Sequence, residues 1–373
     1  MNYRFLFYIS YSYSIPIGNP LEKEILSRGY QVKWFSDEPD GAQILEDKDN
    51  VLNSIQEVMS YNPHILLVST DYVPDFLPGL KVQIFHGFLT YKRPEKGNSE
   101  AHFRVRGFFD LYCTQGPNTT GPFKALSQRK GHFEVIETGW SKVDPLFLHK
   151  KRDEVTSKVV LIASTFTKRL SLAYNEDVFN EIKRLSETGK YQFKMVLHPK
   201  VPEDIKAKWQ SLNGSHYKFY NTTDLAPLFL KSDILLADTT SAIQEFLLQI
   251  KPVVTFRHTI KHPYLCHAEQ ASELEQRIDQ ALDFSNDLKA LIQDFVANLH
   301  PYTDGKSSER VIDASIDFLH KDKSYMQPKP LNLWRKYLMR KKLNYFTFKS
   351  YNRALTIPRD QISNPQNSIR PND

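Results

Sequence analysis

The chain has 373 residues, of which 40% are hydrophobic and 25% are charged, and its formal net charge is +6 at pH 7. This composition is typical of an ordinary globular protein and excludes a disordered or fibrous chain. The length favours two domains over one. The two cysteines, Cys113 and Cys266, exclude a disulfide scaffold and predict a reducing compartment, so the expected location is the cytoplasm.

Residues 1–18 are apolar, but they lack the basic region followed by an unbroken apolar core that a signal peptide requires, so we expect a first strand there. No later stretch approaches the roughly 18 uninterrupted apolar residues of a membrane-spanning helix. Any contact with a membrane is therefore expected to be peripheral.

Short apolar runs rich in β-branched and aromatic residues alternate with helical patterns, which is typical of a parallel sheet built from βα units. The predicted strands are 3–9, 30–35, 64–69, 81–85, 111–114 and 133–137 in the first half, and 158–163, 192–197, 217–220, 233–237 and 253–256 in the second. The charged stretch 147–157 predicts a linker. We therefore expect an α/β protein with two Rossmann-like, doubly wound domains facing each other across a cleft, at residues 1–148 and 158–320.

Residues 321–354 are expected to form a basic amphipathic segment. Cationic side chains alternate there with apolar ones: Arg335, Lys336, Arg340, Lys341, Lys342, Lys349 and Arg353 with Trp334, Leu338, Leu343 and Phe346. This mixture favours an anionic membrane surface as a partner, at the inner face of the cell membrane. The alternative is a basic helix that closes the fold against the first domain. Nucleic acid is not expected as a partner, and the polar residues 355–373 predict a disordered tail.

Several common signatures do not occur. The sequence has no G-x-G-x-x-G, no Walker loop and no D-x-D at the end of a strand. Dinucleotide and P-loop NTPase functions therefore lack their motifs, and so does a transferase in which acidic residues hold the cation. We expect no cofactor, and the sequence leaves a requirement for a divalent metal open.

Chemistry is expected directly after the strands, because open parallel sheets bind ligands beyond the carboxyl ends of their strands. In the first domain the run "KVQIFHGF" ends in His86 and Gly87, followed by Lys92 and Arg93. An imidazole there is suited to act as a general base, and a glycine allows a ligand to approach the backbone. The alternative is that His86 only caps the strand.

In the second domain three stretches have similar positions. "VVLIASTFTKR" leaves its strand into Thr165, Lys168 and Arg169, and "VLHPK" ends in His198 and Lys200. Hydroxyl and basic groups in such loops suit phosphate oxygens. "DILLADTTSAIQEF" places Thr239, Thr240 and Ser241 at a predicted helix start, with Glu245 one turn later. Ordinary polar turns and helix caps remain the alternatives.

Two further stretches contain potential ligand-binding residues. "YTDGKSSER" places Ser307 and Ser308 at another predicted helix start, which favours a second anion contact. His258, His262, Cys266 and His267 fall within one short stretch and are potential zinc ligands, but they lack a second regularly spaced pair. The sequence therefore predicts no metal site, and the combined loops predict a diphosphate ligand bound mainly by the second domain.

The order of "HG", "ASTF", "LHP", "ADTTS" with Glu245, and "DGKSSER" over residues 81–315 resembles the CDP-glycerol glycerophosphotransferases, which make teichoic acids and capsular polymers. The resemblance implies the GT-B architecture. It also implies transfer of glycerol phosphate, or a related polyol phosphate such as ribitol phosphate, from a CDP-activated donor to a hydroxyl of a cell-envelope polymer, with release of CMP.

The resemblance also implies roles for single residues. His86 would be the catalytic base for the acceptor hydroxyl, and His198 would contact the donor diphosphate. Glu245 would bind the ribose. The donor phosphates would be held by Thr165, Lys168, Arg169, Lys200, Thr239, Thr240, Ser241, Ser307 and Ser308, and the acceptor side would include Gly87, Lys92, Arg93, Lys142 and Asp144.

The chain departs from the family's pattern at three places. Phe88 follows His86-Gly87 where threonine is usual, and Lys92 comes six residues after the histidine instead of five. "TGWSKVD" stands where Gly-x-Pro-Arg-x-Asp is usual, and Thr167 replaces an arginine. Two alternative functions remain: a GT-B glycosyltransferase or nucleotide-sugar epimerase that uses a UDP- or CMP-sugar, because "DTTSAIQEF" also resembles the epimerases, and a non-catalytic component that binds polymer during assembly or export.

Overall fold

The computed structural model describes residues 2–88, 103–148 and 157–363. These residues divide into two compact units. The first unit contains residues 2–87, 103–144 and 302–363, and the second contains 88, 145–148 and 157–301. In the described part of the chain, no helix has both the length and the apolarity to cross a membrane.

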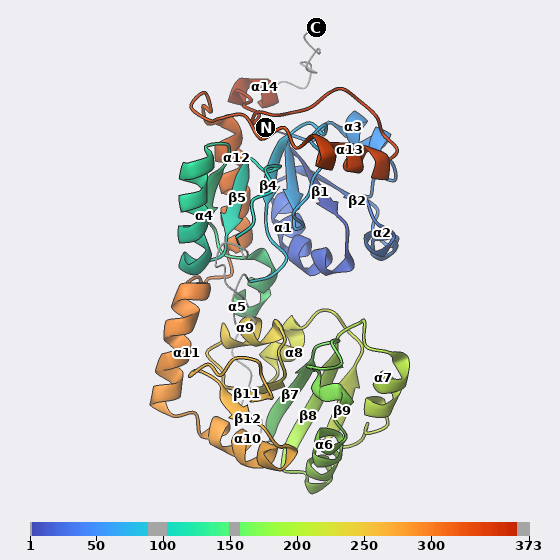
Figure 1. Ribbon diagram of the computed structural model, residues 1–373, viewed down its shortest axis with the longest axis vertical. Helices are drawn as coiled ribbons and strands as arrows, with labels where there is room; N and C mark the ends of the chain where they lie inside the picture. The colour runs from blue at the N-terminus through green and yellow to red at the C-terminus, as the bar shows by residue number, and fades with distance from the viewer. Residues whose placement is uncertain (1, 89–102, 149–156, 364–373) are drawn as a thin grey trace. The chain divides into compact units, whose positions relative to one another are not determined.

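A parallel six-stranded sheet forms the centre of the first unit (Figure 1). Its strands are β1 (Arg4–Ile9), β2 (Gln31–Ser36), β3 (Ile65–Val68), β4 (Leu80–Gln83), β5 (Leu111–Thr114) and β6 (Glu134–Glu137). The strand order is β2-β1-β3-β4-β5-β6, so the direction of winding reverses between β1 and β3. Open α/β sheets bind ligands at such a reversal, outside the carboxyl ends of the strands.

The second unit contains another parallel six-stranded sheet, in the order β12-β11-β10-β7-β8-β9. Its strands are β7 (Lys158–Ser164), β8 (Tyr191–Leu197), β9 (Tyr217–Tyr220), β10 (Ile234–Ala237), β11 (Val253–Phe256) and β12 (Cys266–Ala268). Counted from β7 this is the 3-2-1-4-5-6 order of dinucleotide-binding folds, and the winding reverses between β7 and β10.

The α-helices surround the two sheets, and a few 3-10 turns connect them. The first unit contains α1 (Ile15–Ser27), α2 (Pro39–Leu45), α3 (Ile55–Tyr61), α4 (Pro117–Lys130), α12 (Ser307–His320), α13 (Leu333–Lys342) and α14 (Arg359–Ser363). The second unit contains α5 (Pro145–Leu148), α6 (Glu176–Thr188), α7 (Glu203–Gln210), α8 (Ala226–Leu230), α9 (Ala242–Leu247), α10 (Leu274–Asp283) and α11 (Asn286–Leu299).

The central strands are apolar on both faces because helices cover both sides of a parallel sheet. In β7 every residue from Val159 to Ser164 is buried. Local signals determine where the covering helices begin and end. In α6, for example, the Asn175 side chain accepts a hydrogen bond from Val178 N at 2.9 Å, and Gly189 ends the helix with a left-handed φ of 72°. All eleven strands predicted from the sequence are confirmed within one or two residues, and β12 is additional.

The helix α12 packs against α1, β3, β4 and β5, and it therefore belongs to the first unit. The strand and helix pattern predicts residues 302–320 as part of the second domain, but the second compact unit ends at residue 301. The apolar stripe of an amphipathic helix predicts that the helix is covered, but it does not show which of two sheets covers it.

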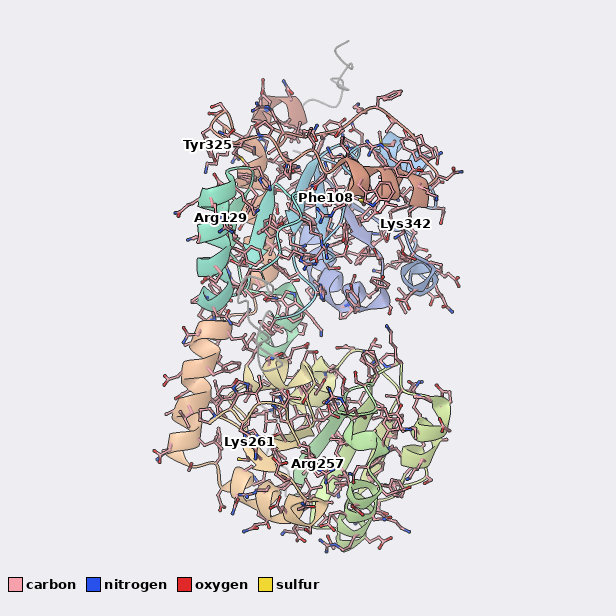
Figure 2. All side chains as sticks on the ribbon, in the orientation of Figure 1. Phe108, Arg129, Arg257, Lys261, Tyr325 and Lys342 are labelled. Carbon is pink, nitrogen blue, oxygen red and sulfur yellow. The ribbon has the colours of Figure 1, made fainter. Side chains whose placement is uncertain are left out.

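The C-terminal segment also packs on the first unit. Asp75 accepts hydrogen bonds from Arg340 at 2.6 and 3.2 Å, and its carbonyl oxygen accepts one from Tyr351 N at 2.9 Å. Lys342, labelled in Figure 2 on α13, forms ion pairs with Asp37 at 2.7 Å and with Glu38 at 2.6 Å. The basic helix thus packs on the first unit, as the second interpretation of its sequence predicted.

The prediction of a disordered tail from residue 355 is not met by residues 355–363. Ile357 and Ile362 are buried, and Ile357 N donates to Leu319 O at 3.2 Å. Arg359 forms an ion pair with Asp317 at 3.0 Å. The two buried isoleucines and these contacts with α12 account for the order of this polar stretch. Residues 364–373 lie outside the described part of the chain.

Candidate active site

His86 lies just beyond the carboxyl end of β4, and its side chain is exposed. Its Nδ1 is 3.2 Å from the carbonyl oxygen of Ser69, which follows β3. A carbonyl oxygen only accepts hydrogen bonds, so this contact requires the proton on Nδ1 and leaves the lone pair on Nε2. This tautomer is the one that accepts a proton from a hydroxyl through Nε2.

The backbone before His86 is strained. Phe85 has a left-handed φ of 57°, which a bulky residue rarely adopts. Its N–H donates to Gln83 Oε1 at 3.0 Å and its carbonyl accepts from Trp140 Nε1 at 3.3 Å, so two buried side chains hold the conformation. Strain of this kind is concentrated at functional sites. Here it ends the strand and brings the next residue, His86, out of the sheet.

Tyr13, which is not among the predicted site residues, lies beside His86 and stacks on Tyr11. Tyr13 follows β1, and its ring is 5.4 Å from the imidazole of His86. Tyr11 and Tyr13 stack on each other at 5.4 Å, and both are exposed. Burial of part of the ring, with Tyr11 next to it, raises the pKa of Tyr13 to about 12, so its hydroxyl remains protonated at neutral pH. The repeated "YSYS" directly after the first strand was the available signal.

His86 contacts Ser69, which follows β3, and Tyr13, which follows β1. It therefore lies where the winding of the first sheet reverses. Gly87 accepts a hydrogen bond from Gln115 Nε2 at 3.0 Å. Among the described residues, no atom would lie within 4 Å of a Cβ at Gly87, so packing does not require a glycine there. Lys92 and Arg93 lie outside the described residues.

Lys142 and Asp144 follow β6 and have different surroundings. The ammonium of Lys142 lies 5.2 Å from the centre of the Trp140 ring. Asp144 is buried, and it accepts hydrogen bonds from Ser307 N at 2.9 Å, from Ser308 N at 2.7 Å and from Ser308 Oγ at 2.7 Å. The carboxylate therefore caps α12 from within the first unit. Burial raises the pKa of Asp144, although these hydrogen bonds favour its ionised form.

This cap changes how Ser307 and Ser308 are understood. Their position at a predicted helix start favours a phosphate ligand. In the structure the same N–H groups are directed at a carboxylate of the protein itself, and the helix belongs to the first unit. Asp144 and Ser307 are 163 positions apart in the sequence, so no local pattern reveals the pairing.

In the second unit, Asp238 connects the two strands at the reversal of the sheet. It follows β10 and is fully buried. It accepts hydrogen bonds from Ser164 Oγ at 2.5 Å, at the end of β7, and from Thr165 N and Leu172 N, each at 3.0 Å, in the connection that follows. Asp238 therefore determines the path of the loop that carries Thr165, Lys168 and Arg169.

The three selected residues of this loop differ in exposure. Thr165 is half-buried, whereas Lys168 and Arg169 are exposed. The ammonium of Lys168 lies 5.8 Å from the centre of the Tyr174 ring. The loop thus presents two cations and a hydroxyl at the carboxyl end of β7, an arrangement that suits an anionic ligand.

His198 follows β8 and lies beside the same loop. Its ring centre is 4.6 Å from that of Phe166, and the Lys200 ammonium is 5.6 Å from the centre of the Phe166 ring. Lys200 N donates to His198 Nδ1 at 3.1 Å. Partial removal of the ring from water lowers the pKa of His198, and the charges of Lys200 and Lys206 add to this effect. The neutral ring, with Nδ1 as acceptor, carries its proton on Nε2.

The two histidines consequently have opposite tautomers. His86 presents an acceptor nitrogen and His198 presents an N–H donor. An acceptor is what a general base needs, and a donor is what a phosphate oxygen needs.

The "DTTS" stretch continues the reversal point of the second sheet. Thr239 Oγ1 accepts from Thr259 N at 3.1 Å, and Thr240 Oγ1 accepts from Ala242 N at 3.4 Å. Ser241 stands at the start of α9 and makes no side-chain capping hydrogen bond. Glu245 is buried on α9. Thr240 thus acts in part as a local helix cap, as the alternative interpretation predicted, whereas the Ser241 hydroxyl does not cap the helix.

The stretch weighed as a zinc site forms β12 and its preceding loop. His267 Nδ1 lies 2.7 Å from Thr255 Oγ1, and its Nε2 lies 3.0 Å from His262 O. Within the described ranges, no group of three or more His, Cys, Asp or Glu side chains is arranged to hold a metal ion. His267 instead contacts β11 through Thr255.

Replacing Asp238 by alanine is expected to weaken the folded state by about 1–3 kcal/mol, because buried donors of Ser164, Thr165 and Leu172 lose their acceptor. Asp204→Ala, at an exposed position, is the control and should change stability by about 0.5 kcal/mol or less. Burial raises the pKa of Asp238 to about 6, so the contribution of this carboxyl to stability falls as the pH rises from about 4 to about 6. Urea unfolding should therefore show a difference between the two proteins that narrows over this range, and a constant difference would contradict the buried geometry.

Comparison with known proteins identifies the family. Residues 23–264 match the family described as CDP-Glycerol:Poly(glycerophosphate) glycerophosphotransferase. No curated protein sequence matches the chain.

Solved structures show the same fold at low sequence identity. A putative UDP-N-acetylglucosamine 2-epimerase from Listeria monocytogenes is 14% identical, with a TM-score of 0.62, and the match covers 87% of this chain and 98% of that one. The wall teichoic acid polymerase TagF is also 14% identical, with a TM-score of 0.57 and coverage of 84% and 88%. A TagF variant soaked with CDPG is 12% identical, with a TM-score of 0.55 and the same coverage.

These neighbours are GT-B enzymes, so the two parallel α/β sheets confirm the expected fold class. The matched region extends from within α1 to the loop before β12, and it includes His86, His198 and the "DTTS" stretch. The chain therefore belongs to the CDP-glycerol:poly(glycerophosphate) glycerophosphotransferase family and is a transferase of that class.

Proposed function

We propose that this enzyme transfers glycerol phosphate from CDP-glycerol to a hydroxyl group of a cell-envelope polymer and releases CMP. The family match supports the donor and the reaction class. The observation that carries the assignment of residues is the pair of histidines with opposite tautomers, each beyond a strand end of its own sheet.

In the proposed reaction, His86 acts on the acceptor. Its Nε2 takes the proton from the acceptor hydroxyl while the oxygen attacks the phosphorus that bears the glycerol. The bond from that phosphorus to the bridging oxygen breaks, and CMP leaves with this oxygen. The hydrogen bond between Nδ1 and Ser69 O keeps the ring oriented and favours the imidazolium that forms. In such transfers, positioning and charge stabilisation supply most of the rate enhancement.

The second unit is proposed to bind the donor. His198 donates from Nε2 to a diphosphate oxygen, and the cations of Lys168, Arg169 and Lys200 balance the phosphate charge. The hydroxyls of Thr165, Thr239, Thr240 and Ser241 are the proposed neutral contacts to the phosphates, and Glu245 is the proposed ribose contact. The reversal of the sheet between β7 and β10 supports this placement, because dinucleotide-binding sheets hold their ligands there.

We remove three residues from the proposed ligand-binding site. Asp144, Ser307 and Ser308 bind one another, and we assign them to the support of the first unit instead of ligand binding. On the acceptor side we retain Gly87 and Lys142 and add Tyr13, whose ring lies beside His86. Lys92 and Arg93 remain proposed from the sequence.

We propose that the enzyme works in the cytoplasm as a peripheral protein at the inner face of the cell membrane. Cys113 and Cys266 are free thiols, as expected for a reducing compartment. The basic C-terminal segment supports the membrane contact.

The function is tested by incubating the purified protein with CDP-glycerol, CDP-ribitol and a UDP-sugar in separate reactions, each with a crude envelope-polymer acceptor. We expect release of CMP from a CDP-polyol and a new phosphodiester signal in the phosphorus NMR spectrum of the polymer. Turnover of the UDP-sugar alone would favour the glycosyltransferase or epimerase alternative. Nucleotide binding without turnover of any donor would favour the non-catalytic alternative.

A further inference from the structure

The helix α13 turns cationic side chains toward the protein and apolar side chains toward solvent. Lys336 and Met339 are buried against the first unit, and Arg340 reaches inward to Asp75. On the opposite side, Trp334 and its neighbours at helical spacing are exposed to solvent. A helix normally buries its apolar stripe and exposes its charges.

The exposed stripe has the spacing of one helix face. Trp334 is 70% exposed, Tyr337 45% and Leu338 44%, and their positions are i, i+3 and i+4. The rings of Trp334 and Tyr337 stack with their centres 5.7 Å apart. This face is therefore a continuous apolar strip and not a set of isolated side chains.

The residues after the helix extend the same surface. Arg340 donates to Thr347 O and to Lys349 O, both at 2.9 Å, so residues 345–349 run back beside α13. Phe346 is 64% exposed and Phe348 is fully exposed. We call the exposed apolar group the α13 surface, and its members are Leu331, Leu333, Trp334, Tyr337, Leu338, Phe346 and Phe348. These seven are nearly half of the sixteen exposed large apolar side chains in the described part of the chain, which marks the surface as a binding site.

The charge around the α13 surface has a single sign. Residues 331–353 contain seven Lys and Arg and no Asp or Glu. The cations Lys336, Arg340 and Lys342 pair with carboxylates of the first unit. Arg335, by contrast, donates to the neutral side chain of Asn332, and both Arg335 and Lys341 are exposed. The apolar strip is therefore bordered by cations that do not serve the fold.

We propose that the α13 surface docks on an anionic lipid bilayer, with its aromatic rings in the interfacial layer and its exposed cations on lipid phosphates. Tryptophan and tyrosine with an apolar body and a polar tip suit this layer, and flanking lysine and arginine are attracted to anionic lipids. A second copy of the chain is a poorer occupant, because a symmetric contact would bring the same cations together.

The internal ion pairs explain why the aromatic side faces outward. Turning α13 over would expose Met339 and place Trp334 against Asp75, whose carboxylate would then lose Arg340. Because a buried carboxylate without a partner is costly, Asp75 holds the helix in the orientation that presents the apolar strip.

The test is flotation of the full-length protein with vesicles of phosphatidylcholine alone and with vesicles that contain 30% phosphatidylglycerol, roughly the anionic fraction at which surface attraction is strong. We expect flotation with the anionic vesicles, and about tenfold weaker partitioning for the double variant Trp334→Ser/Phe348→Ser. The matched control is Leu26→Ser/Leu291→Ser, which removes two exposed apolar side chains elsewhere and should float like the wild type. Lys341→Ala should weaken partitioning about fivefold, and added salt should weaken it further.

Equal flotation of the Trp334/Phe348 variant and the wild type would overturn the proposal, and so would no flotation with anionic vesicles. Self-association of the wild type in sedimentation, lost in that variant and without flotation, would assign the α13 surface to a second copy and also overturn it. Flotation needs no donor, so its failure is distinguishable from failure of the transferase assay.

Discussion

Replacement of His86 by alanine is expected to reduce the rate of CMP release by about 10²- to 10⁴-fold, the usual contribution of a general base. The imidazole is exposed. Among the described residues, its ring makes one hydrogen bond, to Ser69 O. Its removal should therefore leave stability within about 1 kcal/mol of the wild type. The expected signature is loss of kcat with little change in the affinity for CDP-glycerol, which the second unit is proposed to bind.

The matched control is His216→Ala. His216 is a half-buried histidine whose ring lies 2.7 Å from Gln192, away from the strand ends that carry the proposed site. Turnover should be measured by CMP release, and donor affinity by calorimetric titration of both variants. Normal turnover of the His86 variant would remove this residue as the base. A loss of donor affinity equal to the loss of turnover would instead place His86 on the donor.

Asp75→Ala is expected to be the most destabilising of the proposed substitutions, at about 3–5 kcal/mol, because it leaves buried cations without their partner. The carboxylate is 4% exposed and binds both Arg340 and Lys336. The matched control is Asp71→Ala, which removes an exposed partner of Arg106 and should cost about 0–1 kcal/mol. Urea unfolding measures both differences.

The pH dependence gives a second readout for Asp75. Burial opposes ionisation, but hydrogen bonds from Arg340 and Ser350 outweigh it and lower the pKa of Asp75. The stabilisation is therefore present above the unfolded pKa of about 4 and is lost as the pH falls below it. The difference between the wild type and Asp75→Ala should be constant near neutral pH and should shrink in acid.

A compensating variant separates the ion pair from the packing. Asp75→Ala/Lys336→Met/Arg340→Met removes all three charged side chains of this ion-pair cluster, so much of the lost stability should return. Limited proteolysis should release the C-terminal segment from Asp75→Ala faster than from the wild type. If Asp75→Ala unfolds like Asp71→Ala, the C-terminal segment is held by other contacts.

Much of the candidate site was predictable because it follows from the order of strands along the chain. Apolar runs identified the strands, and parallel strands place their following residues at one edge of a sheet. His86, Thr165 and His198 were found in this way. Tyr13 was not predicted, because "YSYS" resembles a continuation of the apolar N-terminal run. Like the other site residues, however, Tyr13 follows a strand, β1.

The role of Asp238 was only partly visible. Its sequence context showed a capping stretch before a helix, and Thr240 does act in that way. The hydrogen bonds of Asp238 to Ser164, Thr165 and Leu172 join positions more than 60 residues apart, and no local pattern predicts them. The order of strands in the second sheet brings β7 and β10 together and so creates this contact.

The sequence by itself determined the fold class, the family and most residues at the strand ends, because hydrophobic periodicity and short motifs are properties of neighbouring positions. Only the tertiary structure decided which sheet α12 covers, that Asp144 occupies the start of this helix, and that α13 turns its cations inward. Each of these depends on which distant surface satisfies a buried charge or an apolar stripe. That choice is made by long-range burial and pairing, which the sequence of one segment does not contain.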